Sequence, residues 1–551
     1  HVTMFAWLAV HLVGWGWRRA GRRWPAALIA LPVPRASALG GIALATAYAL
    51  FAGWGVPAQR TLLMLAVVMG LRLRGRHWPW PVAWLAAMAV VLLLDPLALM
   101  QPGFWLSFVA VGILFAADPG RAAATGAGRP WWRRGIAAVR RQLAEQAVIT
   151  VALAPLTLLL FAQVSLVGLL ANLLAVHWVT VLVTPLAFLG VLWPPVWTVA
   201  AWAVGLMSQV LTVMAGWPWA VFERPIAPWP LAAMAVAGGI ILVQRWTWVL
   251  RSAGLLLVWP VLLWAPPRPA AGEFEVMAID VGQGSALLVR TARHTLLYDT
   301  GPAQGEGSNA GDRVIVPLLR ALGERLDAVV VSHGDSDHAG GMPAIAAAHP
   351  RARWLAPFAD EPERRCVAGQ HWAWDGVRFE IVHPWPQDYG AQGEPLLDDN
   401  AMSCVLRITH GPGRESAWLT GDIDAEREVR LAMAMPGARA SLWMAPHHGS
   451  KTSSTPVWLN VLQPRQIVVQ AGYRNPFGHP APTVIARYRQ RGIPWVASPA
   501  CGAAVWRSDA PDAVHCWRDE DRRYWRWRQA GTADDGGPPA EPMPASHQGM
   551  P

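Results

Sequence analysis

A cluster of histidine and aspartate residues follows an apolar segment in the second half of this 551-residue chain. Asp327–Val331 contains the run Ala-Val-Val-Val and predicts a buried strand. His333 and Asp335 follow it two residues apart, so both side chains can point to one side. Asp337 and His338 are adjacent and can serve a second ion. The pattern predicts a compact metal-binding turn rather than an ordinary strand-to-helix loop.

Polar groups follow three later apolar segments in the same way. Asp422 follows one predicted strand, and His447 and His448 follow a second. His479 lies after a third. The strands are predicted at 417–419, 441–445 and 467–470. Because each group follows a strand, all of them can meet at one rim of a β-sandwich, where Asp422 could bridge two ions and one of the adjacent histidines could be a ligand.

Each of these later residues also has a structural interpretation. Taken alone, Asp422 could be a turn residue, and the adjacent histidines could equally be structural. His479 could be structural, or it could support a metal ligand from behind, donate a proton or contact a substrate. The ligand interpretation rests on all segments together, since two hydrolytic ions ~3.5–4 Å apart can clamp an in-line displacement. We assign His333, Asp335 and His447 to one ion and Asp337 and His338 to the other, with Asp422 between them.

The first half of the chain is strongly apolar. Residues 1–270 contain 19 arginines and four acidic residues, far below the ~25% charged content typical of soluble domains. Apolar runs with almost no polar face lie at 2–17, 39–56, 61–71, 82–94, 103–117, 146–162, 164–192, 199–215, 230–243 and 247–264. Several are shorter than the ~20 residues that span a bilayer and could be tilted or re-entrant. We predict a polytopic α-helical membrane domain over 1–266 with about 8–10 apolar segments.

The loops between these runs give an orientation. Arginines cluster in alternate loops, which stay cytoplasmic. Counting through ten spans puts the chain from 271 onward on the periplasmic side of the cytoplasmic membrane. Polar residues within the apolar half could line a path through the membrane, or could cap helices and sit at the interface. These channel candidates are His1, Gln59, Arg60, Gln101 and Ser107.

The second half has the composition of a soluble domain. The net charge of +10 divides into +15 over residues 1–270 and −5 over the remainder, so its sign says little about affinity for DNA. We predict a domain over 272–528, with a hairpin around Gly282-Gln283-Gly284, and a disordered tail over 529–551. Because the sequence starts at His1 inside an apolar run, we expect it to be part of a longer protein.

The four cysteines fall into two pairs with different expectations. Cys501 and Cys516 flank a predicted hairpin and could form a disulfide, as periplasmic proteins do. Cys366 and Cys404 lack a C-x-x-C spacing, and we expect each to be a plain buried residue.

The predicted metal-binding segments resemble the metallo-β-lactamase superfamily, whose signature is H-x-H-x-D-H. The resemblance implies an αββα sandwich that binds one or two divalent ions. Asp335 replaces the usual second histidine, and Asp399 or Asn400 stands where a further histidine is often expected. Carboxylate and amide oxygens favour Mn²⁺ or Mg²⁺ relative to Zn²⁺.

The joint pattern resembles the ComEC family of DNA-internalisation competence proteins over nearly the whole chain. The resemblance is carried by the segments 280–284, 332–341, 419–422, 447–450 and 473–480, and by 56–60 and 95–108 in the apolar half. It implies an inner-membrane channel that takes up single-stranded DNA in natural transformation, with a nuclease domain that degrades the other strand. The family's N-terminal DNA-binding part would lie upstream.

The resemblance also implies roles and partners. Asp337 and His479 would be catalytic, and Lys451 and Arg474 could contact phosphate, although Lys451 could equally be a plain surface residue. Partners would be DNA, membrane lipid and a DNA receptor. An ATP-driven motor would be a further partner, because the sequence itself contains no P-loop. A homo-oligomer is also possible.

Two other functions stay open at this point. Asp335 motivates a transport-only channel with a catalytically silent lactamase-like module. The third hypothesis is a membrane-tethered metallohydrolase for a non-DNA substrate such as a cell-envelope ester or lactam. Metal binding and DNA cleavage by the second half would distinguish the three.

Overall fold

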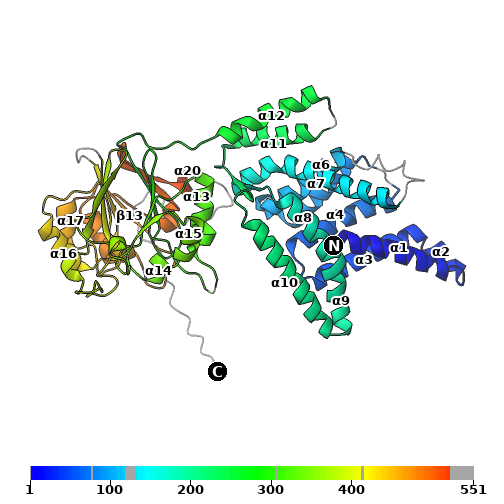
Figure 1. Ribbon diagram of the computed structural model, residues 1–551, viewed down its shortest axis with the longest axis horizontal. Helices are drawn as coiled ribbons and strands as arrows, with labels where there is room; N and C mark the ends of the chain where they lie inside the picture. The colour runs from blue at the N-terminus through cyan, green and yellow to red at the C-terminus, as the bar shows by residue number, and fades with distance from the viewer. Residues whose placement is uncertain are drawn as a thin grey trace. The chain divides into compact units, whose positions relative to one another are not determined.

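The structure, a computed structural model, describes residues 2–75, 78–117, 131–244, 246–305, 307–410 and 415–521. The chain divides into two compact units, His1–Ala265 and Pro266–Pro551. Figure 1 shows helices throughout the first unit and both sheets and helices in the second. The channel candidate His1 and the predicted tail at 529–551 lie outside the described residues.

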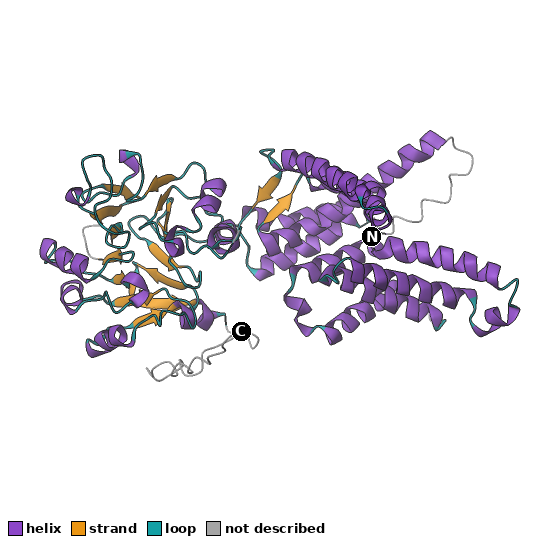
Figure 2. Ribbon diagram, turned by 90° about the horizontal axis from the view of Figure 1, so that it is seen from below, coloured by secondary structure: helices purple, strands orange, loops and turns teal. Residues whose placement is uncertain are grey.

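In its described residues, the first unit consists of helices and one short two-stranded ribbon (Figure 2). Each of the ten apolar runs coincides for most of its length with one or more of these helices. The elements are α1 (Val2–Ala20), α2 (Pro25–Ala30), α3 (Val33–Phe51), α4 (Val56–Leu73), α5 (Trp80–Leu94), η1 (Pro96–Met100), α6 (Pro102–Ala117), α7 (Trp131–Phe161), β1 (Gln163–Ser165), α8 (Gly168–Trp178), η3 (Val179–Val183), α9 (Thr184–Leu192), α10 (Pro195–Ala215), β2 (Val221–Glu223), α11 (Trp229–Val243) and α12 (Trp248–Leu263).

These helices have the lengths and surfaces of a membrane domain. Four are long and apolar enough to span a bilayer by length and composition, namely Val56–Leu73, Gln142–Phe161, Gly168–Leu192 and Pro195–Ala215. Four shorter apolar helices accompany them, α5, α6, α11 and α12. Large apolar side chains point outward, with Leu93, Leu192 and Trp229 82%, 85% and 78% exposed. Lipid rather than water suits such a surface, and the first unit is a polytopic α-helical membrane domain.

The second unit contains two seven-stranded sheets. The first has the order β14-β13-β12-β11-β10-β9-β8, and the second β16-β15-β3-β4-β5-β6-β7. The first comprises β8 (His371–Trp374), β9 (Val377–His383), β10 (Val405–His410), β11 (Glu415–Leu419), β12 (Leu442–Met444), β13 (Gln466–Val469) and β14 (Trp495–Ala497). The second comprises β3 (Glu275–Ala278), β4 (Leu287–Arg290), β5 (Thr295–Tyr298), β6 (Ala328–Val330), β7 (Arg353–Leu355), β15 (Ala504–Arg507) and β16 (Ala510–Cys516).

Helices cover the outer face of each sheet. In Figure 1, α13 and α15 lie on one side of the strands and α16 and α17 on the other. The helical segments are η4 (Gly311–Ile315), α13 (Val316–Leu322), α14 (Ser336–Ala339), α15 (Met342–Ala348), η5 (Pro362–Arg364), η6 (Pro386–Asp388), α16 (Ala425–Ala434), η7 (Pro446–Gly449), α17 (Pro456–Leu462), α18 (Pro482–Gln490), α19 (Ser498–Cys501) and α20 (Trp517–Glu520). The second unit is therefore the expected αββα sandwich.

Alternating side chains build three apolar layers. Successive strand residues point to opposite faces. Leu287 and Val289 of β4 face the other sheet, whereas Leu288 between them packs under the outer helices. In β11, Ala417 faces inward and Trp418 packs under the helices on its side. Both faces of the strands are buried, which explains their near-continuous apolar sequences.

Parallel pairing brings several strand ends to common edges. β5 pairs in parallel with β6, and β12 pairs in parallel with both β11 and β13. The polar residues that follow these strands therefore leave each sheet in the same direction. The candidate metal centre forms where these polar residues meet.

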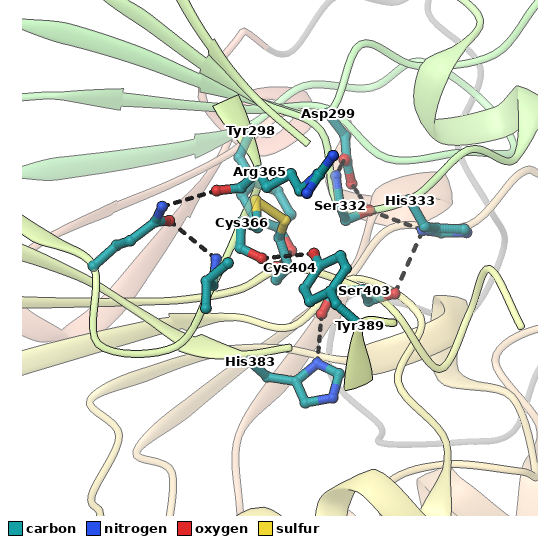
Figure 3. The surroundings of a disulfide bond; sticks show 12 residues. Tyr298, Asp299, Ser332, His333, Arg365, Cys366, His383, Tyr389, Ser403 and Cys404 are labelled. Atoms are coloured by element: carbon teal, nitrogen blue, oxygen red, sulfur yellow. Dashed lines mark hydrogen bonds between the residues drawn. A yellow bond between two sulfur atoms is a disulfide. The ribbon is translucent and has the colours of Figure 1, made fainter. Parts of the chain in front are cut away.

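The expectation for two of the cysteines was wrong. Cys366 and Cys404 form a disulfide with their Cα atoms 5.9 Å apart, and Cys501 and Cys516 form another. The first bond joins the loop after β7 to the start of β10 (Figure 3). The residues are separated by 38 positions, so no local spacing indicated the pairing. Cys404 also lies directly after Ser403, a residue of the site described below.

Removing the Cys366–Cys404 bond should destabilise the second unit. The loop-entropy relation gives about 4 kcal/mol for a Cys366→Ser/Cys404→Ser variant, because the bond closes a loop of 38 residues. Proteolysis of the full chain in a urea series, read on fragments of the second unit, measures the change. The Cys501→Ser/Cys516→Ser variant is the comparator, at about 3 kcal/mol for its separation of 15. Equal urea resistance of wild type and the first variant would contradict the account.

Candidate metal centre

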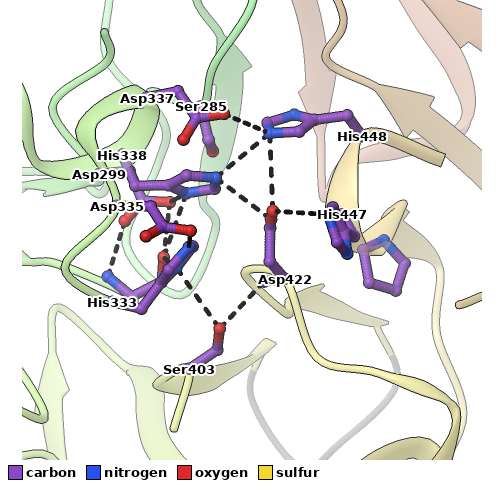
Figure 4. Close-up of polar contacts among 12 residues, drawn as sticks. Ser285, Asp299, His333, Asp335, Asp337, His338, Ser403, Asp422, His447 and His448 are labelled. Carbon is purple, nitrogen blue, oxygen red and sulfur yellow. Dashed lines mark hydrogen bonds and ion pairs between the residues drawn. The ribbon is translucent and has the colours of Figure 1, made fainter. Parts of the chain in front are cut away.

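The site lies where strands from both sheets end. His333 and His338 follow β6, whereas Asp422 follows β11 and His448 follows β12. Figure 4 shows these side chains pointing toward one another from separate segments. Two groups have ligand atoms within 4.8 Å of one another: His333, His338 and Asp422, and Asp337, His338 and His448.

His338 occupies the centre of the cluster. Its Nδ1 lies 2.8 Å from Asp299 Oδ2, so the Asp299 carboxylate accepts the Nδ1 proton. Its Nε2 lies 3.2 Å from both Asp422 Oδ1 and His448 Nε2. A carboxylate behind an imidazole fixes its tautomer and orientation and makes the other nitrogen a better ligand.

The other two buried histidines are held in the same tautomer. His448 Nδ1 donates to the carbonyl oxygen of Gln470 over 2.9 Å. Ser332 Oγ donates to Asp299 Oδ2 over 3.0 Å, so it accepts the proton of His333 Nδ1 over 2.9 Å. In each ring a hydrogen bond fixes a proton on Nδ1, so Nε2 is the nitrogen that faces the cluster.

This arrangement favours a positive charge between the rings. The Nε2 atoms of His338 and His448 are 3.2 Å apart, and two bare lone pairs at that distance would repel, so a proton or a metal ion between them is favoured. His333 Nε2 is buried and has no hydrogen-bond partner among the described residues, with Asp335 Oδ2 3.4 Å away. One orphaned imidazole nitrogen and two further Nε2 atoms beside carboxylates are a donor set for a divalent cation, so the residues fit the metal that the fold implies.

The carboxylates give the cluster a negative potential. Burial disfavours the charged form of Asp422, but the attraction of His338 and His448 outweighs it and holds the pKa of Asp422 well below its usual range. Burial acts against the charged form of His338 as well, but Asp422 and Asp299 outweigh it and raise the pKa of His338 well above its usual value. Burial and the neighbouring His338 instead lower the pKa of His333.

Asp337 and His448 form the more accessible side of the cluster. His448 Nε2 lies 3.1 Å from Asp337 Oδ2 and 3.6 Å from Asp422 Oδ2. Burial disfavours ionisation of Asp337, but contact with His448 and the charge of His338 outweigh it and lower the pKa of Asp337. The Asp337 side chain is 31% exposed, so a substrate can reach it.

The adjacent histidines adopt an unusual backbone. His447 and His448 have φ values of 51° and 55°, in the left-handed region that non-glycine residues rarely occupy. The turn sends the buried His448 ring toward His338, whereas His447 Nε2 lies 3.8 Å from Asp422 Oδ2 and its side chain is 28% exposed. Such strain is concentrated at functional sites.

Two glycines allow the segments to approach closely. Gly421 has a φ of +53°, and a Cβ there would lie 2.7 Å from Ser332 Cβ and 2.9 Å from Ser403 Cβ. Gly284 has a φ of +141°, and a Cβ there would lie 2.4 Å from the carbonyl oxygen of Asp337. A larger residue at Gly421 would push apart segments of the two sheets, and one at Gly284 would displace the segment that carries Asp337.

The structure groups the predicted ligands differently from our assignment. His338 lies with His333, and His448 rather than His447 contacts the buried core of the cluster. The half-exposed Asp335 and His447 lie at its margin. Adjacent residues Asp337 and His338 diverge on α14, yet both reach His448 because it sits between them.

The remaining candidates of the second unit lie around the cluster. Asp399 lies beside the loop, since a Cβ on Gly334 would be 3.5 Å from Asp399 Oδ2. Asn400 Oδ1 is buried and has no hydrogen-bond partner within the described ranges. The His479 ring lies 5.9 Å from that of His447, centroid to centroid, and burial and the two neighbouring histidines lower the pKa of His479. Lys451 and Arg474 are exposed.

The channel candidates of the first unit include one compact polar group. Arg60 is buried in α4, and a Cβ on Gly103 of α6 would lie 2.9 Å from Arg60 Nη2. Gln101 Nε2 donates to Asp95 Oδ2 over 3.4 Å. Gln59 donates instead to the Trp54 carbonyl, and the half-buried Ser107 lies further along α6.

Sequence reasoning missed three contributors to the centre. Asp299 directly follows β5, the same signal that revealed the other ligands, but the glycine turn that it precedes contains no histidine. Nothing in the sequence around Ser332 and Ser403 indicated a role at the site. Ser403 Oγ accepts the Asp422 N–H over 3.0 Å and lies 3.5 Å from His333 Nδ1, so it joins the two sheets at the site.

Known proteins match both units of the chain. A family model described as "Competence protein" matches residues 1–249, and the metallo-β-lactamase superfamily model matches 279–416. The chain is 37% identical over 517 residues to the competence protein ComA of Neisseria gonorrhoeae, covering 91% of this chain and 68% of that protein. The chain belongs to the ComEC family of competence proteins.

Two further ComEC relatives cover a similar extent. The Escherichia coli protein YcaI is 31% identical, with 91% of this chain and 65% of that protein covered. Recombination protein 2 of Haemophilus influenzae is 27% identical, with 81% and 60% covered. The chain therefore spans between 60% and 68% of the length of these relatives. Its lactamase fold is one that binds divalent metal ions.

Weakening the carboxylate behind His338 should weaken metal binding. We expect Asp299→Asn to lower the affinity of the full chain for Mn²⁺ or Zn²⁺ about tenfold, because the charge that polarises His338 is lost. Equilibrium dialysis in detergent with elemental analysis measures it. Asp375→Asn is the matched control, a buried carboxylate that binds Arg293 and His294 instead. An unchanged affinity in Asp299→Asn would refute the role of this contact.

Proposed function

We propose that this ComEC-family chain is an inner-membrane channel for single-stranded DNA in natural transformation, and that its second unit is a metal-dependent nuclease that degrades the other strand. The names of its relatives support the role in competence. The main support for nuclease activity is that three histidine Nε2 atoms and two carboxylates converge at one rim. Hydrolysis of a phosphodiester is the reaction to which such a site is suited.

The metal ligands would come from both sheets. His333, His338 and Asp422 would hold one divalent ion, and Asp337 and His448 a second, with Asp335 and His447 near enough to complete the two sets. Mn²⁺ and Zn²⁺ are the principal candidates, with Mg²⁺ the third. When bound, the ions supply Lewis-acid activation of water and neutralise charge on the phosphate.

The residues around the ligands would handle protons and substrate. Hydrolysis forms a bond from a water oxygen to phosphorus, and the bond from phosphorus to a sugar oxygen breaks. Asp337 is exposed enough to accept the proton of the water. His479, whose ring lies 5.9 Å from that of His447, would pass a proton taken up from solvent to the departing sugar oxygen. Lys451 and Arg474 would hold neighbouring phosphates as cations.

A polar group in the first unit supports the channel. Arg60 Nη1 is buried and has no hydrogen-bond partner in the described part of the chain. Burying a cation in a membrane domain is expensive, and such residues mark the paths of charged substrates. We propose that Arg60 and the neighbouring Gln101 contact phosphates of the transported strand.

The two disulfides support an orientation. Disulfides persist in the periplasm and are rare in the cytosol. We therefore propose that the second unit lies on the periplasmic side, where incoming double-stranded DNA arrives. A DNA receptor and an ATP-driven motor would be its partners in the membrane, and the chain could act as an oligomer.

Variants in the two units test the two parts of the proposal. Asp337→Ala should lower cleavage of DNA by the full chain in detergent with Mn²⁺ at least about 100-fold, because a ligand and proton acceptor is lost. Asp337→Ala and Arg60→Ala should each lower transformation frequency in cells. Met433→Ala is the control, since Met433 is 78% exposed on α16.

The outcomes separate the alternatives. Normal transformation in both variants would contradict the proposal. A wild-type chain that binds neither Mn²⁺ nor Zn²⁺ and cuts no DNA, yet supports transformation, would favour a transport-only channel. Hydrolysis of envelope esters or lactams without DNA cleavage would favour a membrane-tethered hydrolase for those substrates.

A further inference from the structure

The loop after β13 displays two aromatic rings to solvent. Phe477 is 66% exposed and Tyr473 is 47% exposed. Within the described residues of the second unit, the other exposed aromatic side chains that carry a large apolar surface are Phe358 and Trp517. A hydrophobic ring held in water beside a polar centre suggests that a ligand covers it.

The loop is fixed in place by its own polar contacts. Asn475 Nδ2 donates to the carbonyl oxygens of Gly472 and His479 over 2.9 and 2.6 Å, and Asn475 Oδ1 accepts the His479 N–H over 2.9 Å. Gly472 N–H donates to Gln283 Oε1 over 2.9 Å, which ties the loop to the β3–β4 hairpin of the other sheet. The exposed rings are therefore displayed on a rigid support, which lowers the entropic cost of binding.

A series of rings connects the loop with the metal centre. The Phe477 and His479 rings are stacked at 5.8 Å with an interplanar angle of 16°. The His479 and His448 rings lie 6.5 Å apart at 28°. Phe477 therefore lies within about 12 Å of the His448 ring, a distance that a few nucleotides span at about 3.4 Å per stacked base.

Positive charge accompanies the rings. The Arg474 guanidinium lies 5.2 Å from the centre of the Tyr473 ring, which keeps the cation at the same surface. Lys451 is exposed and follows His447-His448 by three positions. Flat aromatic rings together with cations are the features that bind single-stranded nucleic acid, the rings by stacking on bases and the cations by contact with phosphates.

We propose that Phe477 and Tyr473 form a stacking subsite for the bases of a single DNA strand, next to the phosphate that is cleaved. The subsite rests on the proposed nuclease function and specifies how the strand is held. It accepts any base, because every base has a face that can stack. Arg474 and Lys451 supply the salt-dependent part of the affinity.

Photo-crosslinking tests the subsite without requiring cleavage. The full chain in detergent with EDTA is irradiated with a single-stranded oligonucleotide that contains 5-iododeoxyuridine, and adducts are mapped on peptides. We expect an adduct on the peptide 475–487, which contains Phe477, and a yield about tenfold lower in Phe477→Leu. Phe477→Trp should restore the yield, because a larger ring stacks as well.

Matched controls separate stacking from a general loss of binding. Trp517→Leu removes an aromatic residue of similar exposure outside the loop and should keep the adduct. An abasic oligonucleotide should compete about tenfold less well than a normal one with wild type, and this difference should shrink in Phe477→Leu, which keeps only the Tyr473 ring. Equal adduct yields in wild type and Phe477→Leu would overturn the subsite. A positive crosslink in a chain that cuts no DNA with Mn²⁺ would instead retain the subsite and reject the nuclease.

Discussion

The metal centre depends on three hydrogen bonds, in each of which a histidine Nδ1 donates its proton to a fixed acceptor. Asp299, Gln470 and Ser332 each accept an Nδ1 proton, so the Nε2 atoms of His338, His448 and His333 face the cluster, with His338 shared by its two ligand groups. The strands place the acceptors, and the acceptors place the ligands. The two sheets therefore position the site through the hydrogen bonds that orient the ligands as well as through the ligands themselves.

Much of this arrangement follows from the sequence. The strand ends that carry His333, Asp422 and His448 are visible as apolar runs followed by polar residues, and parallel pairing makes such ends meet. The membrane helices follow from apolar runs without polar faces. These signals are local, and they predict the elements and the rim on which the site forms.

The features that escaped prediction depend on three-dimensional contacts. Which of His447 and His448 enters the cluster is decided by two left-handed backbone positions, which the residue types alone do not reveal. The Cys366–Cys404 bond joins segments separated by 38 positions, with no spacing motif to mark it. Asp299 has the same local signal as a ligand, but its distance to His338 gives it a supporting role.

The rigid loop held by Asn475 has a consequence for movement of a strand. Its conformational entropy is lost when the protein folds, not when a base arrives, so each base that stacks on Phe477 meets the same surface at the same free energy. A strand drawn past such a ring experiences an energy profile that repeats with every nucleotide. The barrier between neighbouring registers is the loss of one stack, about 1–3 kcal/mol, low enough for rapid stepping and high enough to favour whole-nucleotide positions.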